Sequence, residues 1–203
     1  MIETSNELIA YWSFFVEREG WSAEWVNDLK REQRPVVLDV GANAGVFSHL
    51  IWTLQPTVKL IAFEPLPRMV EKLRQWKSRT GADFTLHETA VADRAGTAQF
   101  YISADNDTTA SLRDTGDKKD TITVPVKPLD DLVKEDNVLL VKIDVEGAEP
   151  EVLAGGKKTI SKARYLLIEA HTGEALQLLQ RELGPGWRHK RVGASDHLFI
   201  RQH

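Results

Sequence analysis

Cysteine is absent from the 203-residue sequence, which excludes disulfide bonds and zinc sites built on cysteine. A long apolar run is missing too, since no stretch approaches the roughly 20 residues of a membrane-spanning helix. Residues 1–6 are polar and acidic, unlike the cationic and apolar start of a signal peptide. We therefore expect no membrane partner and a cytoplasmic location.

An excess of positive charge is also missing. The chain has 26 Lys and Arg against 30 Asp and Glu, a net charge of -4, whereas proteins that grip a nucleic-acid backbone usually have a basic surface. We therefore expect no nucleic-acid partner. With 42% hydrophobic and 28% charged residues, the composition is that of an ordinary globular protein. The length suits one α/β domain with at most a short appendage.

From Pro35 onward, short apolar runs alternate with stretches of helical periodicity. Such alternation indicates βαβ units and a parallel sheet. The last two runs, Trp187–Val192 and His197–Ile200, are expected to pair antiparallel. The other expected strands of this sheet are Val36–Val40, Val58–Phe63, Phe84–Val91, Val138–Val145 and Tyr165–Ala170. The sequence thus predicts an α/β fold with a Rossmann-like, doubly wound, mostly parallel seven-stranded sheet whose last strand is antiparallel.

Residues 1–34 precede this alternation and are expected to form a helical appendage to a domain of residues 35–203. Apolar residues recur at helical spacing from Leu8 to Val16, and Ser22 can cap a second N-terminal helix. The aromatic content favours packing against the flank of the sheet. A lid over a ligand cleft and a homodimer surface are the alternatives.

An insertion at about residues 96–126 interrupts the alternation. Thr97–Ile102 and Thr121–Val126 are predicted to form a hairpin. The polar stretch Ser103–Asp120 between them is long for a loop inside a compact domain, and loops of this length are often functional.

The segment Val36–Gly45 (VVLDVGANAG) places a glycine-rich turn between an expected strand and an expected helix, the local context of a nucleotide-type site. The middle glycine of the dinucleotide fingerprint, which lets backbone approach a pyrophosphate, is replaced by Asn43. Asp39 adds a carboxylate that would repel a pyrophosphate but attract the cationic ammonium group of S-adenosylmethionine (SAM). Asp39, Gly41, Asn43 and Gly45 are therefore candidate SAM-binding residues.

A second acid, Glu64, ends the next expected strand, 23 positions after Gly41. An acid about 20 residues past the first glycines conventionally accepts the hydroxyls of a ribose. NAD and SAM are both ribosides, so Glu64 supports the site without choosing the ligand. A nicotinamide-dependent oxidoreductase therefore stays open as an alternative, although the chain contains neither G-x-G-x-x-G nor Tyr-x-x-x-Lys.

Three charged residues follow one another at alternate positions, Lys142, Asp144 and Glu146. The period of two predicts that they share one face of the strand Val138–Val145. Charges are costly on a strand that is buried on both faces. They are better tolerated at its carboxyl end, where open α/β sheets keep their ligand cleft. Glu149 is expected only to favour the start of the next helix electrostatically.

Glu169 and His171 lie on the same side of the end of the following strand. They could join Asp144 near the group that would accept a methyl from SAM, or they could be ordinary residues at the end of a strand. Carboxylates and an imidazole could also hold a divalent cation such as Mg²⁺ or Mn²⁺. The sequence does not favour this, and we predict no metal site.

Five segments occur in a characteristic order: VVLDVGANAG, AFEP at 62–65, ETAVAD at 88–93, PLDDL at 128–132 and KIDVEGAEPEVLAGG from 142. In this order the chain resembles the FkbM-type SAM-dependent methyltransferases, from about Val36 to Ala170. The resemblance implies a class I methyltransferase fold and O-methylation of a small molecule or carbohydrate. The residues that it implies are Asp39, Gly41 and Asn43 for SAM, Glu64 for the ribose, Ala90 and Val91 near the adenine, and Ser111 and Leu112 near the acceptor.

The sequence thus predicts a SAM-dependent O-methyltransferase that releases S-adenosylhomocysteine (SAH). Asp144, Glu146 or His171 would accept the proton of the acceptor hydroxyl, and Lys142 would hold an oxyanion or tether the carboxylates. Glu169 and Asp144 would contact the acceptor and SAM, respectively. The alternatives are the oxidoreductase and a non-catalytic SAM-binding protein.

Overall fold

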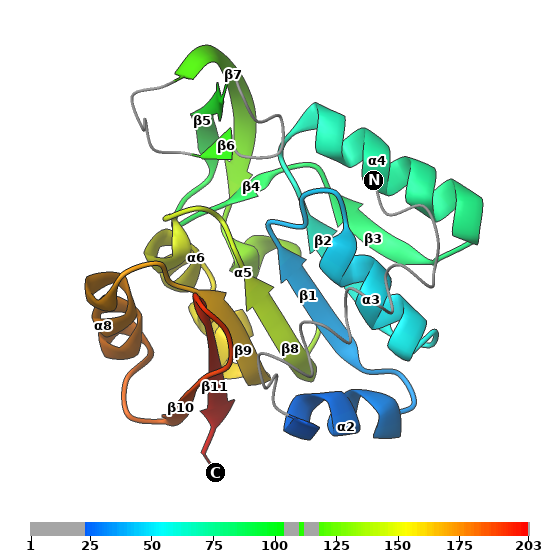
Figure 1. The fold of residues 1–203 in the computed structure, drawn as a ribbon, viewed down its shortest axis with the longest axis vertical. Helices are drawn as coiled ribbons and strands as arrows, with labels where there is room; N and C mark the ends of the chain where they lie inside the picture. The colour runs from blue at the N-terminus through cyan, green and yellow to red at the C-terminus, as the bar shows by residue number, and fades with distance from the viewer. Residues whose placement is uncertain (1–22, 104–109, 112–117, 203) are drawn as a thin grey trace.

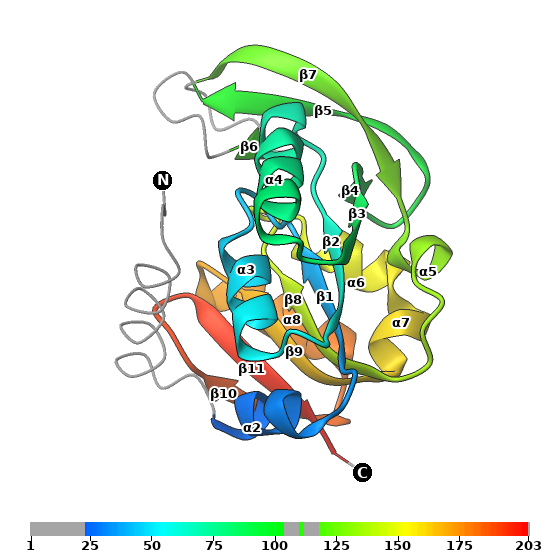
Figure 2. The ribbon, with the colours of Figure 1, turned by 90° about the vertical axis from the view of Figure 1, so that its right-hand side faces the viewer.

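The computed structural model describes residues 23–103, 110–111 and 118–202. The helix expected from Leu8 to Val16, the cap at Ser22 and the acceptor candidate Leu112 lie outside these residues. Within them, a large sheet with helices on both faces carries a smaller sheet beyond one end (Figures 1 and 2). No helix in the described part of the chain is both long enough and apolar enough to cross a membrane.

The main sheet has seven strands in the order β10-β11-β9-β8-β1-β2-β3. The five strands from β9 to β3 pair in parallel, and β11 pairs antiparallel with both β9 and β10. The predicted seven-stranded, mostly parallel sheet with an antiparallel last strand is therefore confirmed. Its strands are β1 Val36–Val40, β2 Lys59–Phe63, β3 Phe84–His87, β8 Val138–Ile143, β9 Ala163–Glu169, β10 Trp187–Arg191 and β11 Asp196–Arg201.

Alternate residues of these strands contact two separate apolar clusters, because successive side chains point to opposite faces. Val37 and Leu167 belong to the cluster that packs under α2, α3 and α4. Leu38 and Leu166 belong to the cluster that packs under α5 to α8. The helices are α2 Ala23–Arg31, α3 Val46–Leu54, α4 Pro67–Thr80, α5 Leu129–Leu132, α6 Glu149–Gly155, α7 Lys157–Ser161 and α8 Gly173–Leu183.

Helix α2 is a packing helix on the flank of the sheet. Trp25 and Leu29 are fully buried in the first apolar cluster. Asp28, on the same helix, accepts hydrogen bonds from Arg164 Nη1 and the Tyr165 hydroxyl, each at 2.9 Å. These contacts tie α2 to the start of β9 from outside the cleft described below.

The smaller sheet has the order β4-β7-β5-β6 and lies beyond the carboxyl ends of β1 and β8 (Figure 1). Strands β5 and β7 pair antiparallel, as Thr97–Ile102 and Thr121–Val126 predict. Phe100, Val124 and Val126 form a small apolar core with Ala90 and Ala92. The strands are β4 Ala90–Val91, β5 Gly96–Ser103, β6 Ala110–Ser111 and β7 Lys118–Lys127.

Two local expectations were wrong, and one helix was missed. The single strand expected at 84–91 is two strands in different sheets, because Thr89 Oγ1 turns to the Pro125 carbonyl at 2.9 Å and directs the chain toward β7. The strand expected at Val138–Val145 ends at Ile143. Helix α7 was not predicted. Two amides in its first turn, Lys158 N and Thr159 N, donate to Asp130 of α5 at 3.0 and 2.8 Å, so a distant helix satisfies them.

Candidate functional site

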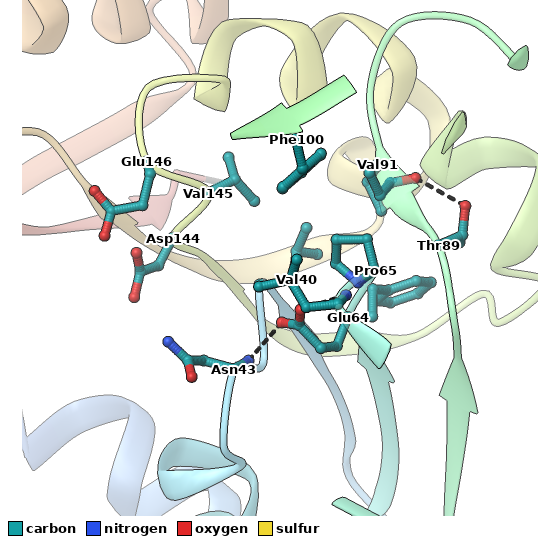
Figure 3. A pocket seen from close by; sticks show the side chains of 14 residues that line it. Val40, Asn43, Glu64, Pro65, Thr89, Val91, Phe100, Asp144, Val145 and Glu146 are labelled. Atoms are coloured by element: carbon teal, nitrogen blue, oxygen red, sulfur yellow. Dashed lines mark hydrogen bonds between the residues drawn. The ribbon is translucent and has the colours of Figure 1, made fainter. Parts of the chain in front are cut away.

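A cleft opens at the carboxyl ends of β1, β2 and β8, where the strand order of the main sheet reverses direction. This switch point is where open α/β sheets bind their ligands. The cleft encloses about 660 Å³, including space open to solvent. It is lined by Val40, Gly41, Asn43, Phe63, Glu64, Pro65, Leu66, Thr89, Ala90, Val91, Phe100, Asp144, Val145 and Glu146 (Figure 3).

The turn after β1 forms the near wall of the cleft. Gly41, Asn43 and Gly45 have φ angles of 79°, 50° and 83°, the left-handed region that glycine enters freely and asparagine tolerates. The amides of Gly41 and Ala42 donate to the Phe63 carbonyl at 3.1 and 3.0 Å. A Cβ on Gly41 would lie 1.8 Å from the Asp144 carbonyl oxygen. Glycine is therefore required here by close approach as well as by conformation.

Glu64 joins this turn to the chain that follows β2. Its Oε2 accepts the Asn43 amide at 2.7 Å (Figure 3), and its Oε1 accepts the Leu66 amide at 2.9 Å. Burial raises the pKa of Glu64 to about 6 against the opposing effect of these bonds. Each carboxylate oxygen can accept a second hydrogen bond. The residue can therefore accept hydroxyl donors from a ligand in the cleft.

Lys142 connects the two ends of the cleft. Its Nζ lies 3.0 Å from Asp144 Oδ2 and 3.6 Å from Asp39 Oδ1, and donates to the Gly41 carbonyl at 3.2 Å. Burial would lower the pKa of Lys142, but the two carboxylates raise it above its ordinary value. The ammonium is thus a fixed cation whose contacts favour the tethering role over the holding of an acceptor oxyanion.

Asp39 is fully buried beside Lys142. Its Oδ2 accepts a hydrogen bond from Ser48 Oγ at 2.6 Å, whereas its Oδ1 has no hydrogen-bond donor among the described residues. Burial raises the pKa of Asp39, and Lys142 opposes that rise. A buried carboxylate oxygen with unused acceptor capacity suits a ligand that donates hydrogen bonds or carries positive charge.

The acidic residues that the sequence singled out gather around Asp144 and Glu146, which line one end of the cleft. Asp144, Glu146 and Glu169 each place an oxygen atom within 4.8 Å of the others. His171 Nε2 lies 3.4 Å from Glu169 Oε2 and 3.9 Å from Glu146 Oε2. The predicted proximity of these four residues is confirmed. The spacing would also suit a divalent cation, but exposed acidic groups are common without one, and no second feature of the described residues points to an ion.

The backbone at Glu146 is not the strand that the alternation of charged residues predicted. The strand ends before it, and its φ of 55° and that of Gly147 at 97° form a left-handed turn. Glu149 holds this turn from the following helix, since its Oε1 accepts the amides of Val145 and Gly147 at 3.3 and 3.0 Å. Glu149 is therefore a structural acceptor as well as a helix-start charge.

Ser195 was missed by the sequence reasoning. It lies in the turn between β10 and β11, where its Oγ donates to Glu169 Oε1 at 2.8 Å and its carbonyl accepts the Ala170 amide at 2.8 Å. No local pattern marks it, because its partner is 26 residues away. Of the remaining candidates, Ala90 and Val91 line the cleft, and Ser111 lies in β6 with its side chain outside the described part.

Comparison with known proteins bears on this site. Residues 39–202 match the sequence model of the methyltransferase FkbM domain. The chain is 31% identical over 159 residues to 2-O-methyltransferase NoeI of Sinorhizobium fredii, covering 70% of this chain and 65% of NoeI. It is 30% identical over 192 residues to 31-O-demethyl-FK506 methyltransferase FkbM of Streptomyces tacrolimicus, covering 73% of each. The chain thus spans just under two thirds of the length of NoeI.

The fold also matches solved structures. A methyltransferase from Geobacter sulfurreducens superposes with a TM-score of 0.55 at 12% identity, covering all of this chain and 93% of that one. At this identity the likeness shows a shared fold alone. Family and fold together indicate SAM as the methyl donor and do not favour a nicotinamide-dependent oxidoreductase. The chain belongs to the FkbM methyltransferase family, as the order of its motifs predicts.

Proposed function

We propose that this protein transfers a methyl group from SAM to a hydroxyl oxygen of a small molecule or carbohydrate. The observation that carries the proposal is the charge of the cleft. Among the described residues, its lining includes three acids, Glu64, Asp144 and Glu146, and no Lys, Arg or His. Such a lining disfavours a pyrophosphate and favours a cationic riboside. Both relatives named above carry O-methylation in their names.

The donor would occupy the half of the cleft next to the Gly41 turn. Asp39, which has a buried oxygen without a hydrogen-bond donor, and the backbone at Asn43 would hold its methionyl end. Glu64 would accept the ribose hydroxyls, and the apolar wall at Ala90 and Val91 would contact the adenine. When bound, SAM supplies a methyl group on a positively charged sulfur, which is already an activated donor.

The acceptor would lie at the acidic end of the cleft. A hydroxyl group has a high pKa, so the protein must position it and remove its proton. Asp144, Glu146 and His171 are the candidates from the sequence, with Glu169 and the segment at Ser111 and Leu112 contacting the acceptor. We expect turnover to need no divalent metal, which an assay in EDTA would check.

Calorimetric titration with SAH, and separately with NADH, tests the donor half. We expect SAH to bind and NADH not to bind. Glu64→Gln should weaken SAH binding by about 10-fold or more, because a charged acceptor of two hydroxyls is lost. The matched control is Glu174→Gln, an exposed acid in the first turn of α8, which should leave SAH affinity unchanged. Binding of NADH alone would contradict the proposal.

Incubation with methyl-labelled SAM and a polar metabolite extract tests the transfer itself. We expect label in a small product that survives strong base, because ethers resist base and methyl esters do not. Label that base removes would place the methyl group on a carboxylate. A protein that binds SAH but labels nothing would be a non-catalytic SAM-binding protein.

A further inference from the structure

The carboxyl group of Glu169 has an environment unlike that of its neighbours. Glu169 is the last residue of β9 and lies on the same face of the sheet as Lys142 and Asp39, because strand positions two apart share a face. Its side chain is 20% exposed, so it is largely buried but still reaches solvent. Ser195 donates to one of its oxygens and His171 lies 3.4 Å from the other.

The carboxyl groups of Glu169 and Asp144 lie next to each other, with oxygen atoms within 4.8 Å. Two negative charges this close repel each other, so the pKa of one of the two groups is raised. The Lys142 ammonium lies 3.0 Å from Asp144 and holds the pKa of Asp144 below its ordinary value despite burial. Burial and the neighbouring Asp144 raise the pKa of Glu169 to about 7. Of the two carboxyl groups, Glu169 is therefore the one that exchanges a proton near neutral pH, and Asp144 stays ionised beside Lys142.

The other candidates fit the role of a base less well. Asp144 is committed to Lys142, and an ion-paired carboxylate with a lowered pKa is a weak base. Glu146 is 42% exposed at the rim of the cleft and His171 is 57% exposed. Glu169 has its position fixed by contacts from three elements: β8, the β10–β11 turn and its own β9–α8 connection.

We propose that Glu169 is the general base of the transfer, that it accepts the proton of the acceptor hydroxyl, and that Asp144 and Ser195 are its positioning residues. The inference rests on the proposed function and adds to it a residue assignment different from the one that the sequence favoured. In the step, the acceptor oxygen forms its bond to the methyl carbon while the carbon–sulfur bond breaks and leaves its electron pair on sulfur. The hydroxyl proton passes to ionised Glu169 and from there to water.

The groups around Glu169 determine in which direction each variant should shift its pKa. Asp144, at the end of β8, raises the pKa of Glu169. Ser195 and His171 oppose that rise, and Lys142 lies behind Asp144. Glu146 faces the same space from the turn after β8, and Asp196 is the register partner of Glu169 on β11.

Carbon-13 NMR of the glutamate carboxyl groups, followed against pH in the SAH complex, tests the assignment without any acceptor. We expect the Glu169 signal to titrate with a midpoint near 7. Asp144→Asn should lower that midpoint by about one unit or more, because a neighbouring negative charge is removed. Ser195→Ala should raise it, because a donor to the ionised form is lost. A midpoint near the ordinary value of about 4.3 would overturn the proposal.

Two further results of the titration test the assignment of Glu169 and its positioning residues. If Asp144→Asn lowers the Glu169 midpoint and Ser195→Ala raises it, the positioning roles are supported. If both variants shift the midpoint in the same direction, those roles are contradicted. Addition of Mg²⁺ should leave the midpoint in place. A fall of the midpoint with Mg²⁺ would show a cation where we place an exchanging proton, and would overturn the assignment.

Turnover with the acceptor that the labelling experiment identifies gives the second readout. Glu169→Gln should lower kcat by about 100-fold or more and leave SAH affinity unchanged, with Glu174→Gln as the unaffected control. Ser195→Ala should lower kcat at pH 7 and recover toward wild type at pH 9. Undiminished kcat in Glu169→Gln would overturn this inference while leaving the proposed function intact. Failure of the wild-type protein to bind SAH would instead contradict the proposed function itself.

Discussion

Replacement of Gly41 by alanine tests how closely the two halves of the cleft are packed. Two costs add in this variant. The φ of 79° is a left-handed conformation, which costs a non-glycine residue roughly 1–2 kcal/mol. The new Cβ would lie 1.8 Å from the Asp144 carbonyl oxygen, so the gap must widen by about 1.6 Å to reach the ordinary contact distance of 3.4 Å.

Overpacking of this kind costs about 1–3 kcal/mol, so we expect Gly41→Ala to lose about 2–5 kcal/mol of unfolding free energy. The same displacement moves the end of β8, which carries Asp144, away from the turn. We therefore expect SAH affinity to fall by about 100-fold, the effect of a shift of about 1 Å in a positioned site. Urea denaturation followed by tryptophan fluorescence and calorimetric titration with SAH measure the two effects.

Two other glycines separate the two costs. Gly81 ends α4 with a φ of 70° and open space around its Cβ position, so Gly81→Ala should show the conformational cost alone. Gly155 has no positive φ, but a Cβ there would lie 2.0 Å from the Ala92 carbonyl oxygen, so Gly155→Ala should show the steric cost alone. If Gly41→Ala destabilises no more than Gly81→Ala and keeps its SAH affinity, the close-approach reasoning is wrong.

Three further perturbations follow from the contacts of the site. Lys142→Met should cost about 3–5 kcal/mol at pH 8 by leaving buried carboxylates without their cation, whereas Lys142→Arg should recover much of it in urea denaturation. Glu149→Ala should lower the free energy of unfolding by about 1–3 kcal/mol, independently of salt, because two backbone amides lose their acceptor. Glu174→Ala, at an exposed position, should change it little. Burial lowers the pKa values of His189 and His197, so the unfolded chain binds more protons below about pH 6.5. Stability should therefore fall from pH 7 to pH 5, and His197→Gln should reduce that slope.

The main sheet could be predicted because each of its strands has a local signal. The strand expected at Val36–Val40 has those bounds in the structure, since a buried β-branched run ends at a glycine turn. The segment 84–91 could not be predicted as two strands. Its apolar pattern is continuous, and the division arises from pairing with β2 on one side and β7 on the other, which no local window contains.

The same limit applies to the site. The neighbourhood of Asp39, Gly41 and Glu64 followed from motifs within single βα units, and the structure brings these residues together at one cleft. Ser195 and the turn-holding role of Glu149 did not follow. The first contacts Glu169 across 26 residues. The second depends on a backbone that leaves the strand early at a left-handed Glu146, where simple alternation no longer applies.

Lys142 shows how the register between two strands brings residues of separate motifs together in one site. Local alternation groups Lys142 with Asp144, on its own segment. The register of β1 against β8 sets Asp39 directly opposite Lys142, at the point where the strand order reverses. One ammonium therefore contacts the carboxylate of the donor half and the carboxylate of the acceptor half. Because its charge holds Asp144 ionised, and Asp144 in turn raises the pKa of Glu169, the loss of this single cation would disturb donor binding and acceptor activation together.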